Sequence, residues 1–405
     1  MKILIVADNY YPNVNGSSYF TQRLAYYMKN RGHEILVMSA SRSMRNELFS
    51  HNGIDVFGLR SFPLSFFYRD FRFSLPIGIA GDVEAEIKRF GPDVIHIQDH
   101  FVISPIVQKV AQDLGIPMIG TNHFMPENVL HYLHLPKKLE QIAKNWAWAQ
   151  FRVIYEQLQT VTTPTRTAAR LLEEVKLTKP VLAVSNGIDL QKFKPDNNGE
   201  YLKKRLNLPD KPILLYVGRL DKEKNLDLVI KSLPDVLAEA EMHFVIAGKG
   251  AETERLQNLV QSLGLTRAVT FAGFIPDEDL PNLYPIAECF VIAGIAELQS
   301  LVTMEAMATG LPVVAVNAMA LPELVRHGEN GYLFDLSRTD LLTRHLIDVF
   351  SDEMLRKRMG ERSLELIQTH DINKTMAIFE SIYKNSIGNE KQKTAEPGRL
   401  YEMVN

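Results

Sequence analysis

The sequence predicts an α/β protein built from two Rossmann-like domains that face each other across a cleft. Short β-rich runs alternate with helical patterns along almost the whole chain, which is typical of parallel sheets covered by helices. The length of 405 residues fits about two domains. The alternation continues through the second half without sequence repetition, so two separate α/β units are expected.

The first domain is expected over residues 1–180. It opens with a buried strand at 3–7, and an amphipathic helix follows at 18–31, where Gly32 is a typical C-terminal cap. The remaining elements are strands at 35–38, 94–98, 118–121 and 161–163 and a largely helical stretch at 126–156.

The second domain is expected over residues 181–370. Its predicted strands lie at 213–217, 244–247, 269–271, 289–292 and 313–316, and helical patterns separate them. A last helix is predicted at 371–387. The tail 388–405 is rich in charged residues, glycine and proline, so we expect it to be loosely ordered.

Composition indicates an ordinary globular protein in a reducing compartment. Hydrophobic residues make up 46% and charged residues 23% of the chain. Cys289 is the only cysteine, which excludes an intrachain disulfide and a thiol metal site. Neither a signal peptide nor a membrane-spanning run is apparent. We expect a cytoplasmic protein, free or attached peripherally at the inner face of the membrane.

Charge is distributed unevenly along the chain. Residues 1–180 hold 20 basic and 16 acidic residues, whereas the remainder holds 25 basic and 32 acidic ones. A mildly basic N-terminal half suits an anionic membrane surface, and chance explains the same count equally well. No nucleic-acid partner is expected.

The common nucleotide-binding motifs are absent from the sequence. No G-x-G-x-x-G follows the first strand, and there is no Walker A motif, so a nicotinamide dehydrogenase or a P-loop enzyme is not expected. The lone G-x-G at 248–250 is weak evidence for any function.

The most informative stretch follows the strand predicted at 289–292. Glu297 lies in a loop, a helix opens around Ser300, and Glu305 falls in its second turn. The backbone amides of Leu301, Val302 and Thr303 would point out of the helix N-terminus, where unpaired N–H groups and the helix dipole bind phosphate. The two carboxylates could then hold sugar hydroxyls. The alternative is a solvated loop acid at 297 and a helix-dipole acid at 305.

A second set of charged residues follows the strand at 213–217. That strand ends at Gly218, and Arg219 and Lys224 come next, five residues apart. Two cations leaving one strand end can clamp a diphosphate, the arginine by its planar fork and the lysine as a point charge. They would also stabilise charge that develops on a leaving group. An ordinary charged loop is the alternative.

Together these motifs resemble the family-4 glycosyltransferases, which have the GT-B fold and retain anomeric configuration. The resemblance covers roughly residues 1–385 and identifies a family rather than a substrate. It rests on the Gly218-Arg219…Lys224 motif, the Glu297-x7-Glu305 pair with the following Ala-Met-Ala-x-Gly-x-Pro-Val-Val, the Asn-Gly-Ile-Asp at 186–189 and the loop at 15–16.

The resemblance implies a role for each motif of the second domain. Arg219 and Lys224 hold the donor diphosphate, Glu297 binds sugar hydroxyls and Glu305 binds the ribose. The segment containing Phe274 and Ile275 lies near the nucleotide base. The donor is a nucleotide-sugar substrate, and no cofactor and no bound metal are implied.

The resemblance also assigns roles outside the second domain. The Gly16 loop lies close to the diphosphate or the acceptor, where a side chain would obstruct approach. His123, directly after a predicted strand end, contacts the donor sugar through its ring or its backbone rather than as a general base. The helix at 371–387 crosses back to the first domain. Transfer would be a front-face attack in which the departing phosphate helps to deprotonate the acceptor.

Two positions depart from the family pattern. Many relatives have glycine where this chain has Ser300, and many have a second glycine where this chain has Ser17 after Gly16. Neither change removes a charged group, so activity is still expected. The two changes are expected to affect the geometry of the bound donor.

Two stretches bear on the acceptor. Residues 59–73 interleave aromatic residues with arginines, and residues 125–138 combine apolar and basic residues, which suits a membrane interface. Aromatic core residues beside solvated arginines are the alternative. Both stretches resemble family members that glycosylate diacylglycerol, which implies transfer from UDP-glucose to a membrane lipid. The alternatives are a soluble or polysaccharide acceptor, a sugar-nucleotide epimerase and a catalytically silent binding protein.

Overall fold

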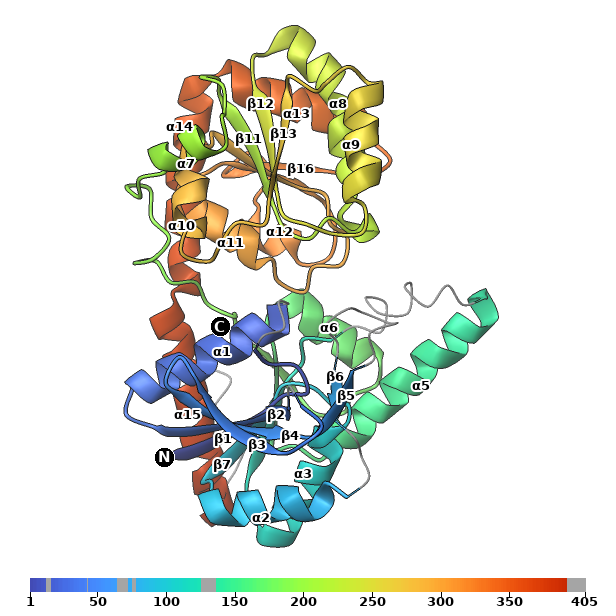
Figure 1. Cartoon of the computed structure of the whole chain (residues 1–405), viewed down its shortest axis with the longest axis vertical. Coiled ribbons are helices and arrows are strands. Elements are labelled where there is room, and N and C mark those ends of the chain that lie inside the picture. The colour runs from blue at the N-terminus through green and yellow to red at the C-terminus, as the bar shows by residue number, and fades with distance from the viewer. Residues whose placement is uncertain (12–15, 42, 64–71, 75–77, 125–135, 392–405) are drawn as a thin grey trace. The chain divides into compact units, whose positions relative to one another are not determined.

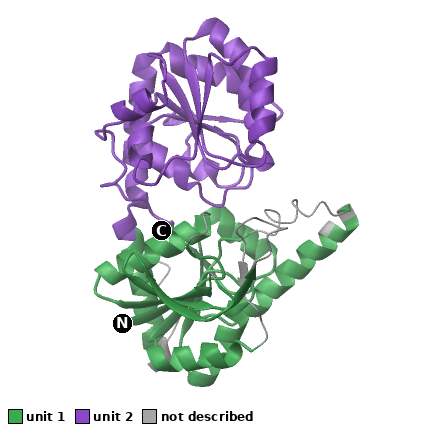
Figure 2. Cartoon of the chain, in the orientation of Figure 1, with its two compact units in different colours: residues 1–185, 375–405 green, residues 186–374 purple. Residues whose placement is uncertain are grey.

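The structure is a computed structural model that describes residues 1–11, 16–41, 43–63, 72–74, 78–124 and 136–391. It divides into two compact units (Figure 2). Unit 1 comprises residues 1–185 together with the chain from 375 onward, and unit 2 comprises residues 186–374. Each unit is an α/β structure around a parallel sheet, which confirms the predicted fold class.

Unit 1 is built on a sheet with the strand order β10-β9-β8-β7-β1-β2-β4-β3 (Figure 1). All neighbours in it are parallel except β3 and β4. Its strands are β1 (Lys2–Val6), β2 (Glu34–Ala40), β3 (Glu47–His51), β4 (Ile54–Leu59), β7 (Val94–Ile97), β8 (Met118–Thr121), β9 (Thr160–Thr163) and β10 (Val181–Ala183). The other elements are the antiparallel pair β5 (Ser61–Pro63) and β6 (Arg72–Ser74) and the helices α1 (Gly16–Asn30), α2 (Ala80–Phe90), α3 (Ile103–Leu114), α5 (Lys137–Tyr155), α6 (Arg166–Glu174) and α15 (Ile372–Lys391).

Unit 2 contains a fully parallel sheet with the order β13-β12-β11-β14-β15-β16. Its strands are β11 (Ile213–Val217), β12 (His243–Ala247), β13 (Val269–Gly273), β14 (Cys289–Ile292), β15 (Val313–Val316) and β16 (Gly331–Phe334). Helices lie on both sides of the strands (Figure 1). They are α7 (Glu200–Arg205), η2 (Lys222–Lys224), α8 (Leu226–Glu239), α9 (Thr253–Ser262), α10 (Leu280–Leu283), η3 (Tyr284–Ile286), α11 (Leu301–Ala308), α12 (Leu321–Leu324), α13 (Thr339–Ser351), α14 (Glu353–Ile367) and η4 (Gln368–His370).

The boundaries of the two units differ from those expected from the sequence. β10 was assigned to the second domain, but Val181 pairs with Val161 of β9 and makes β10 the edge strand of the sheet in unit 1. α15 also continues to Lys391, so the start of the predicted loose tail is helical. Residues 392–405 lie outside the described residues.

The strands read as continuous apolar runs because helices cover both faces of a parallel sheet. Four successive residues of β1, from Ile3 to Val6, are completely buried, and all five residues of β12 are buried as well. Among the described helices, none is both long and apolar enough to cross a bilayer.

Helix α15 contacts the sheet of unit 1 at a buried histidine. His96, in β7, shares hydrogen bonds with the Tyr383 hydroxyl of α15 at Nδ1 (2.8 Å) and with Thr121 Oγ1 at Nε2 (2.7 Å). Burial lowers the pKa of His96 to about 3, so the ring is neutral at physiological pH. Phe379 lies on the same side of α15, and its ring centroid is 5.5 Å from that of His96. This contact makes α15 part of the core of unit 1.

Replacing Tyr383 with phenylalanine should therefore destabilise unit 1. The substitution keeps the ring and leaves the buried His96 Nδ1 without its partner, which costs about 1–3 kcal/mol. The measurement is the urea denaturation midpoint of the full chain. Tyr26→Phe is the matched control because Tyr26 is 47% exposed, and surface changes of this kind stay within about 0.5 kcal/mol. Equal midpoints for the two variants would contradict the assigned role.

Candidate functional site

The carboxyl edge of the sheet in unit 2 carries most of the predicted site residues. Because all its strands are parallel, the loops that follow β11, β12, β13 and β14 emerge at this edge. Backbone hydrogen bonds join three of these loops: Gly218 N donates to Ala247 O (3.0 Å), and Gly248 N donates to Gly273 O (2.7 Å). Leu220 N also donates to Lys249 O (3.0 Å). The loops therefore form one connected layer.

Two glycines make this close packing possible. A Cβ added to Gly248 would overlap the carbonyl oxygen of Gly218, and one added to Gly250 would overlap that of Leu220. Gly248 also has a φ of +143°, which a residue with a side chain rarely adopts. The G-x-G motif at 248–250, which by itself is weak evidence for a function, is thus required by the backbone of the predicted site.

Lys224 and Glu297 meet at this edge, although they are 73 residues apart in sequence. Lys224 Nζ lies 2.6 Å from Glu297 Oε1, and the two side chains are 14% and 16% exposed. The loop after β14 comes close enough that a Cβ on Gly294 would lie 3.2 Å from Glu297 Oε1 and 3.3 Å from Lys224 Cδ. The two residues predicted to bind different parts of the donor therefore neutralise each other.

Arg219 lies beside this pair with acidic neighbours of its own. Its guanidinium is ion-paired with Asp221 and with Glu223, the latter at 3.2 Å, and its side chain is 41% exposed. The hydroxyl of Tyr216 donates to the carbonyl oxygen of Arg219 (2.8 Å), which holds the backbone in place. Burial, and to a smaller extent the charge of Glu297, raise the pKa of Tyr216, so the phenol stays protonated.

Ser300 is the N-cap of α11, as expected for a helix opening at this position. Its Oγ accepts hydrogen bonds from Thr303 N (3.3 Å) and from Thr303 Oγ1 (2.8 Å). The expectation that the Thr303 amide is unpaired is therefore wrong. Ser300, which stands where many relatives have glycine, accepts the hydrogen bond of this amide within the first turn. Leu301 and Val302 are the first two residues of the helix, where backbone N–H groups have no partner within the helix, and their binding of phosphate stays a prediction.

Glu305 is a buried acceptor rather than a surface acid of the helix dipole. It is 8% exposed, and the hydroxyl of Tyr284 in η3 donates to its Oε2 (2.6 Å). Burial and the adjacent carboxylate raise the pKa of Tyr284, which keeps the donor proton on the phenol. Nothing in the local sequence pattern pointed to Tyr284, which lies 21 residues before its partner.

The predicted base-binding segment follows β13 directly. The side chain of Phe274 is 55% exposed at the carboxyl edge of the sheet, whereas Ile275 is 6% exposed and belongs to the hydrophobic core of unit 2. Of these two residues, only Phe274 has a side chain that is accessible to a ligand, because the side chain of Ile275 is buried.

His123 lies in unit 1, directly after β8. Its Nε2 shares a hydrogen bond with Gln98 Oε1 (3.2 Å), and its ring centroid is 4.7 Å from that of Phe20. Burial lowers the pKa of His123 to about 3, so the ring is uncharged at neutral pH.

Gly16 begins α1, and a Cβ added to it would meet no described atom within 4 Å. Packing within the described chain therefore does not require glycine at this position.

A buried carboxyl pair near His123 was not singled out from the sequence. Asp8 N donates to Asp99 Oδ2 (2.7 Å), and the Asp8 carboxyl accepts from Val102 N (3.0 Å) and Ile103 N (3.2 Å) at the start of α3. Burial raises the pKa of both carboxyls, and the charge of Asp8 adds to the rise at Asp99. A polar run directly after the apolar strand β7 is the sequence signal that could have revealed them.

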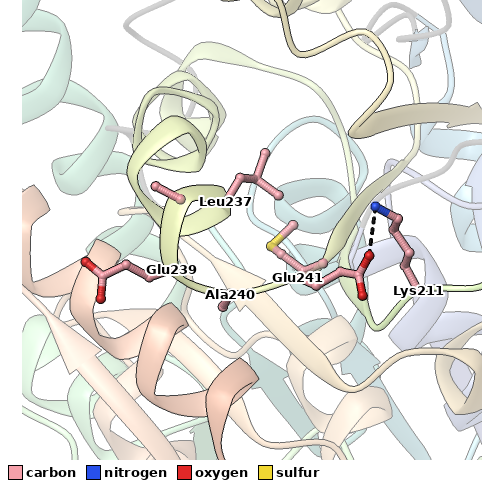
Figure 3. Close-up of a pocket in the computed structure, with 7 residues that line it drawn as sticks. Lys211, Leu237, Glu239, Ala240 and Glu241 are labelled. Carbon is pink, nitrogen blue, oxygen red and sulfur yellow. Dashed lines mark ion pairs between the residues drawn. The ribbon is translucent and has the colours of Figure 1, made fainter.

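A pocket of about 350 Å³ lies elsewhere in unit 2 (Figure 3). Its lining includes Lys211 and Glu241, whose ion pair measures 3.0 Å. These residues precede β11 and β12, so the pocket lies at the amino edge of the sheet, opposite the predicted site.

Among the described residues, no group of three or more histidine, cysteine or acidic side chains is placed to hold a metal ion.

Much of the segments assigned to the acceptor lies outside the described residues. This applies to 64–71 within the 59–73 segment and to 125–135 within the 125–138 segment. The membrane contact predicted for them stays a prediction.

Two family models match the chain, one in each half. Residues 14–192 match the model described as Glycosyltransferase Family 4, and residues 197–365 match Glycosyl transferases group 1. The alpha-monoglucosyldiacylglycerol synthase of Streptococcus pneumoniae is 26% identical over 98% of this chain and 94% of its own length. Spore coat protein SA of Bacillus subtilis is 33% identical over 69% of this chain and 75% of its own length.

Solved structures agree with the sequence matches on the fold. The sucrose-phosphate synthase of Thermosynechococcus elongatus is similar with a TM-score of 0.76 at 20% identity, over 96% of this chain and 99% of that one. Similarity at this identity concerns the fold, which is GT-B. The chain belongs to the glycosyltransferases defined by the family-4 and group-1 models.

Proposed function

We propose that this glycosyltransferase moves glucose from UDP-glucose to diacylglycerol or a related membrane lipid, with retention of anomeric configuration, at the inner face of the cytoplasmic membrane. The observation that carries the proposal is the Lys224–Glu297 ion pair beside Arg219 and the N-terminus of α11. This group of residues combines two cations and a helix dipole for a diphosphate with a carboxylate for sugar hydroxyls.

Donor binding would begin with an exchange of partners. The diphosphate brings at least two negative charges, so Lys224 turns from Glu297 to a phosphate oxygen while Arg219 and the amides of α11 take the others. Glu297 is then released to accept hydrogen bonds from the hexose. The ion pair in the free protein thus keeps both side chains at the place where the donor needs them.

Glu305 would hold the ribose. Its carboxylate is buried and oriented by Tyr284, and a carboxylate can accept hydrogen bonds from two neighbouring hydroxyls. The exposed ring of Phe274 is available to stack on the base.

The transfer step would follow a front-face course. The bond between the anomeric carbon and the diphosphate oxygen breaks, and the acceptor oxygen forms its bond to that carbon on the same face. The acceptor proton passes to the departing phosphate oxygen. Arg219 and Lys224 stabilise the charge of the leaving group without a metal ion. His123 stays a predicted contact of the sugar, and its neutral ring suits hydrogen bonding rather than charge stabilisation.

The similarity to a monoglucosyldiacylglycerol synthase over nearly the full length supports a glucose donor and a lipid acceptor. Uridine follows from the family resemblance. A soluble or polysaccharide acceptor is the alternative within the same enzyme class. UDP release with and without diacylglycerol vesicles distinguishes the lipid acceptor from this alternative.

Glu297→Gln should separate sugar recognition from diphosphate binding. We expect transfer to fall about 100-fold, while UDP affinity stays equal or increases because Lys224 loses its competing carboxylate. Initial rates and calorimetric titration with UDP measure the two effects. Glu254→Gln is the control, since Glu254 is an exposed acid on α9. Unchanged transfer, or a loss of UDP affinity equal to the loss of transfer, would refute the assigned role.

Arg219→Ala should weaken UDP binding. The substitution removes a charge-assisted contact and leaves Asp221 and Glu223 to repel the diphosphate, so we expect about a 10- to 100-fold rise in the dissociation constant. Calorimetry measures it, with Arg267→Ala as the control, because Arg267 is an exposed arginine in the turn between α9 and β13. Equal affinities for the two variants would remove Arg219 from the donor site.

The acceptor is tested by UDP release from UDP-glucose, with and without diacylglycerol in vesicles. We expect vesicles with diacylglycerol to stimulate release and a glucosylated lipid to form, and both to be lost in Glu297→Gln. Glycosylation of a soluble alcohol or oligosaccharide, without stimulation by the lipid, would establish the alternative acceptor class. No turnover with any acceptor would reject UDP-glucose as the donor.

A further inference from the structure

Helix α5 is apolar on two opposite sides. Its inner side belongs to the core of unit 1: Trp148 is 8% exposed, and Phe151 and Tyr155 are completely buried. A helix at the surface of a globular protein normally has a polar outer side. The outer side of α5 is apolar instead.

Four large apolar side chains lie on this outer side. They follow one another at intervals of three, four and seven residues, so they form a single stripe along the helix. The stripe consists of Leu139, Ile142, Trp146 and Val153, which are 52%, 63%, 66% and 56% exposed. Figure 1 shows the first half of α5 extending away from the other elements of unit 1, and three of the four residues belong to that half.

The charge of α5 indicates what would cover the stripe. The helix carries four basic residues, Lys137, Lys138, Lys144 and Arg152, and one acidic residue, Glu140. Lysine and arginine side chains can bury their aliphatic stems at an apolar boundary while their charged ends reach anionic headgroups. A second copy of the chain fits this surface poorly, because stripe-to-stripe contact would bring two strongly basic helices together.

We propose that the outer stripe of α5 docks on a bilayer surface that contains anionic lipids. The helix lies in the interface with Trp146 at the level of the headgroups, and the basic residues add attraction to the anionic lipid. The stripe itself, from Leu139 to Val153, follows the segment 125–138 in the chain and shares no residue with it or with the segment 59–73. Docking goes beyond the proposed transfer and requires neither donor nor acceptor, so it can be tested in their absence.

The two tryptophans allow a direct test. Trp148 is buried and Trp146 is exposed, so the full-length Trp148→Phe variant reports on Trp146 alone. Vesicles of phosphatidylcholine with phosphatidylglycerol should shift its fluorescence to shorter wavelength, and brominated acyl chains should quench it. Pure phosphatidylcholine should have a smaller effect. Sedimentation of the unmodified chain with the same vesicles gives a second measurement that does not depend on the substitution.

Variants of the stripe and of its charges test the two contributions separately. Ile142→Gln with Val153→Gln keeps the reporter and should lower the partition coefficient on anionic vesicles at least about tenfold. Leu48→Gln with Met354→Gln is the matched control. These side chains are 60% and 62% exposed but do not belong to α5, so their replacement should leave the partition coefficient unchanged. Lys138→Glu with Arg152→Glu should remove the preference for anionic over neutral vesicles.

Three results would overturn the proposal. The first is the absence of a spectral change and of sedimentation with anionic vesicles. The second is a shift that grows with protein concentration without vesicles, which would establish contact between copies. The third is the emission of a buried indole in the free protein, which would mean that the chain itself covers Trp146. Transfer to detergent-dispersed lipid is measured separately, so loss of docking and failure of the proposed reaction give different results.

Discussion

Close backbone packing at the carboxyl edge of unit 2 is the constraint on which the candidate donor site depends. The loop after β12 passes so near the loop after β11 that Gly248 and Gly250 have no room for a side chain. This packing fixes the backbone from Gly218 onward and therefore the points from which Arg219 and Lys224 extend. The backbone from which the two cations extend is thus held by hydrogen bonds within the protein, although their side chains are paired with acids.

The same edge balances its charges internally. Asp221 and Glu223 pair with Arg219, and Glu297 pairs with Lys224, so the charges of both cations are compensated within the protein. Removing partly buried charges from water has a cost, which paired acids reduce. A diphosphate must therefore replace existing partners rather than fill an empty positive site. This favours a ligand that offers both phosphate oxygens for the cations and hydroxyls for the displaced carboxylate.

Sequence reasoning succeeded where an element and its side chain are neighbours in the chain. The α/β class followed from the alternation of patterns, and the opening of a helix around Ser300 followed from the strand–loop–helix order there. It failed where a contact joins distant segments, as with Tyr284 and Glu305 or Asp8 and Asp99. The assignment of β10 failed for a related reason, since three residues show no periodicity and only their pairing with β9 places them.

The two units differ in the charge of their polar residues at the carboxyl edges of the sheets. In unit 1, burial lowers the pKa of His96 and His123 and raises the pKa of Asp8 and Asp99, which disfavours the charged form of all four side chains. In unit 2, the corresponding edge carries paired but ionic side chains. Desolvated neutral groups recognise hydroxyls at little electrostatic cost, whereas charged groups are needed to bind a diphosphate. This contrast supports the proposed function, in which unit 2 would bind the anionic nucleotide-sugar and unit 1 would contact uncharged hydroxyl groups.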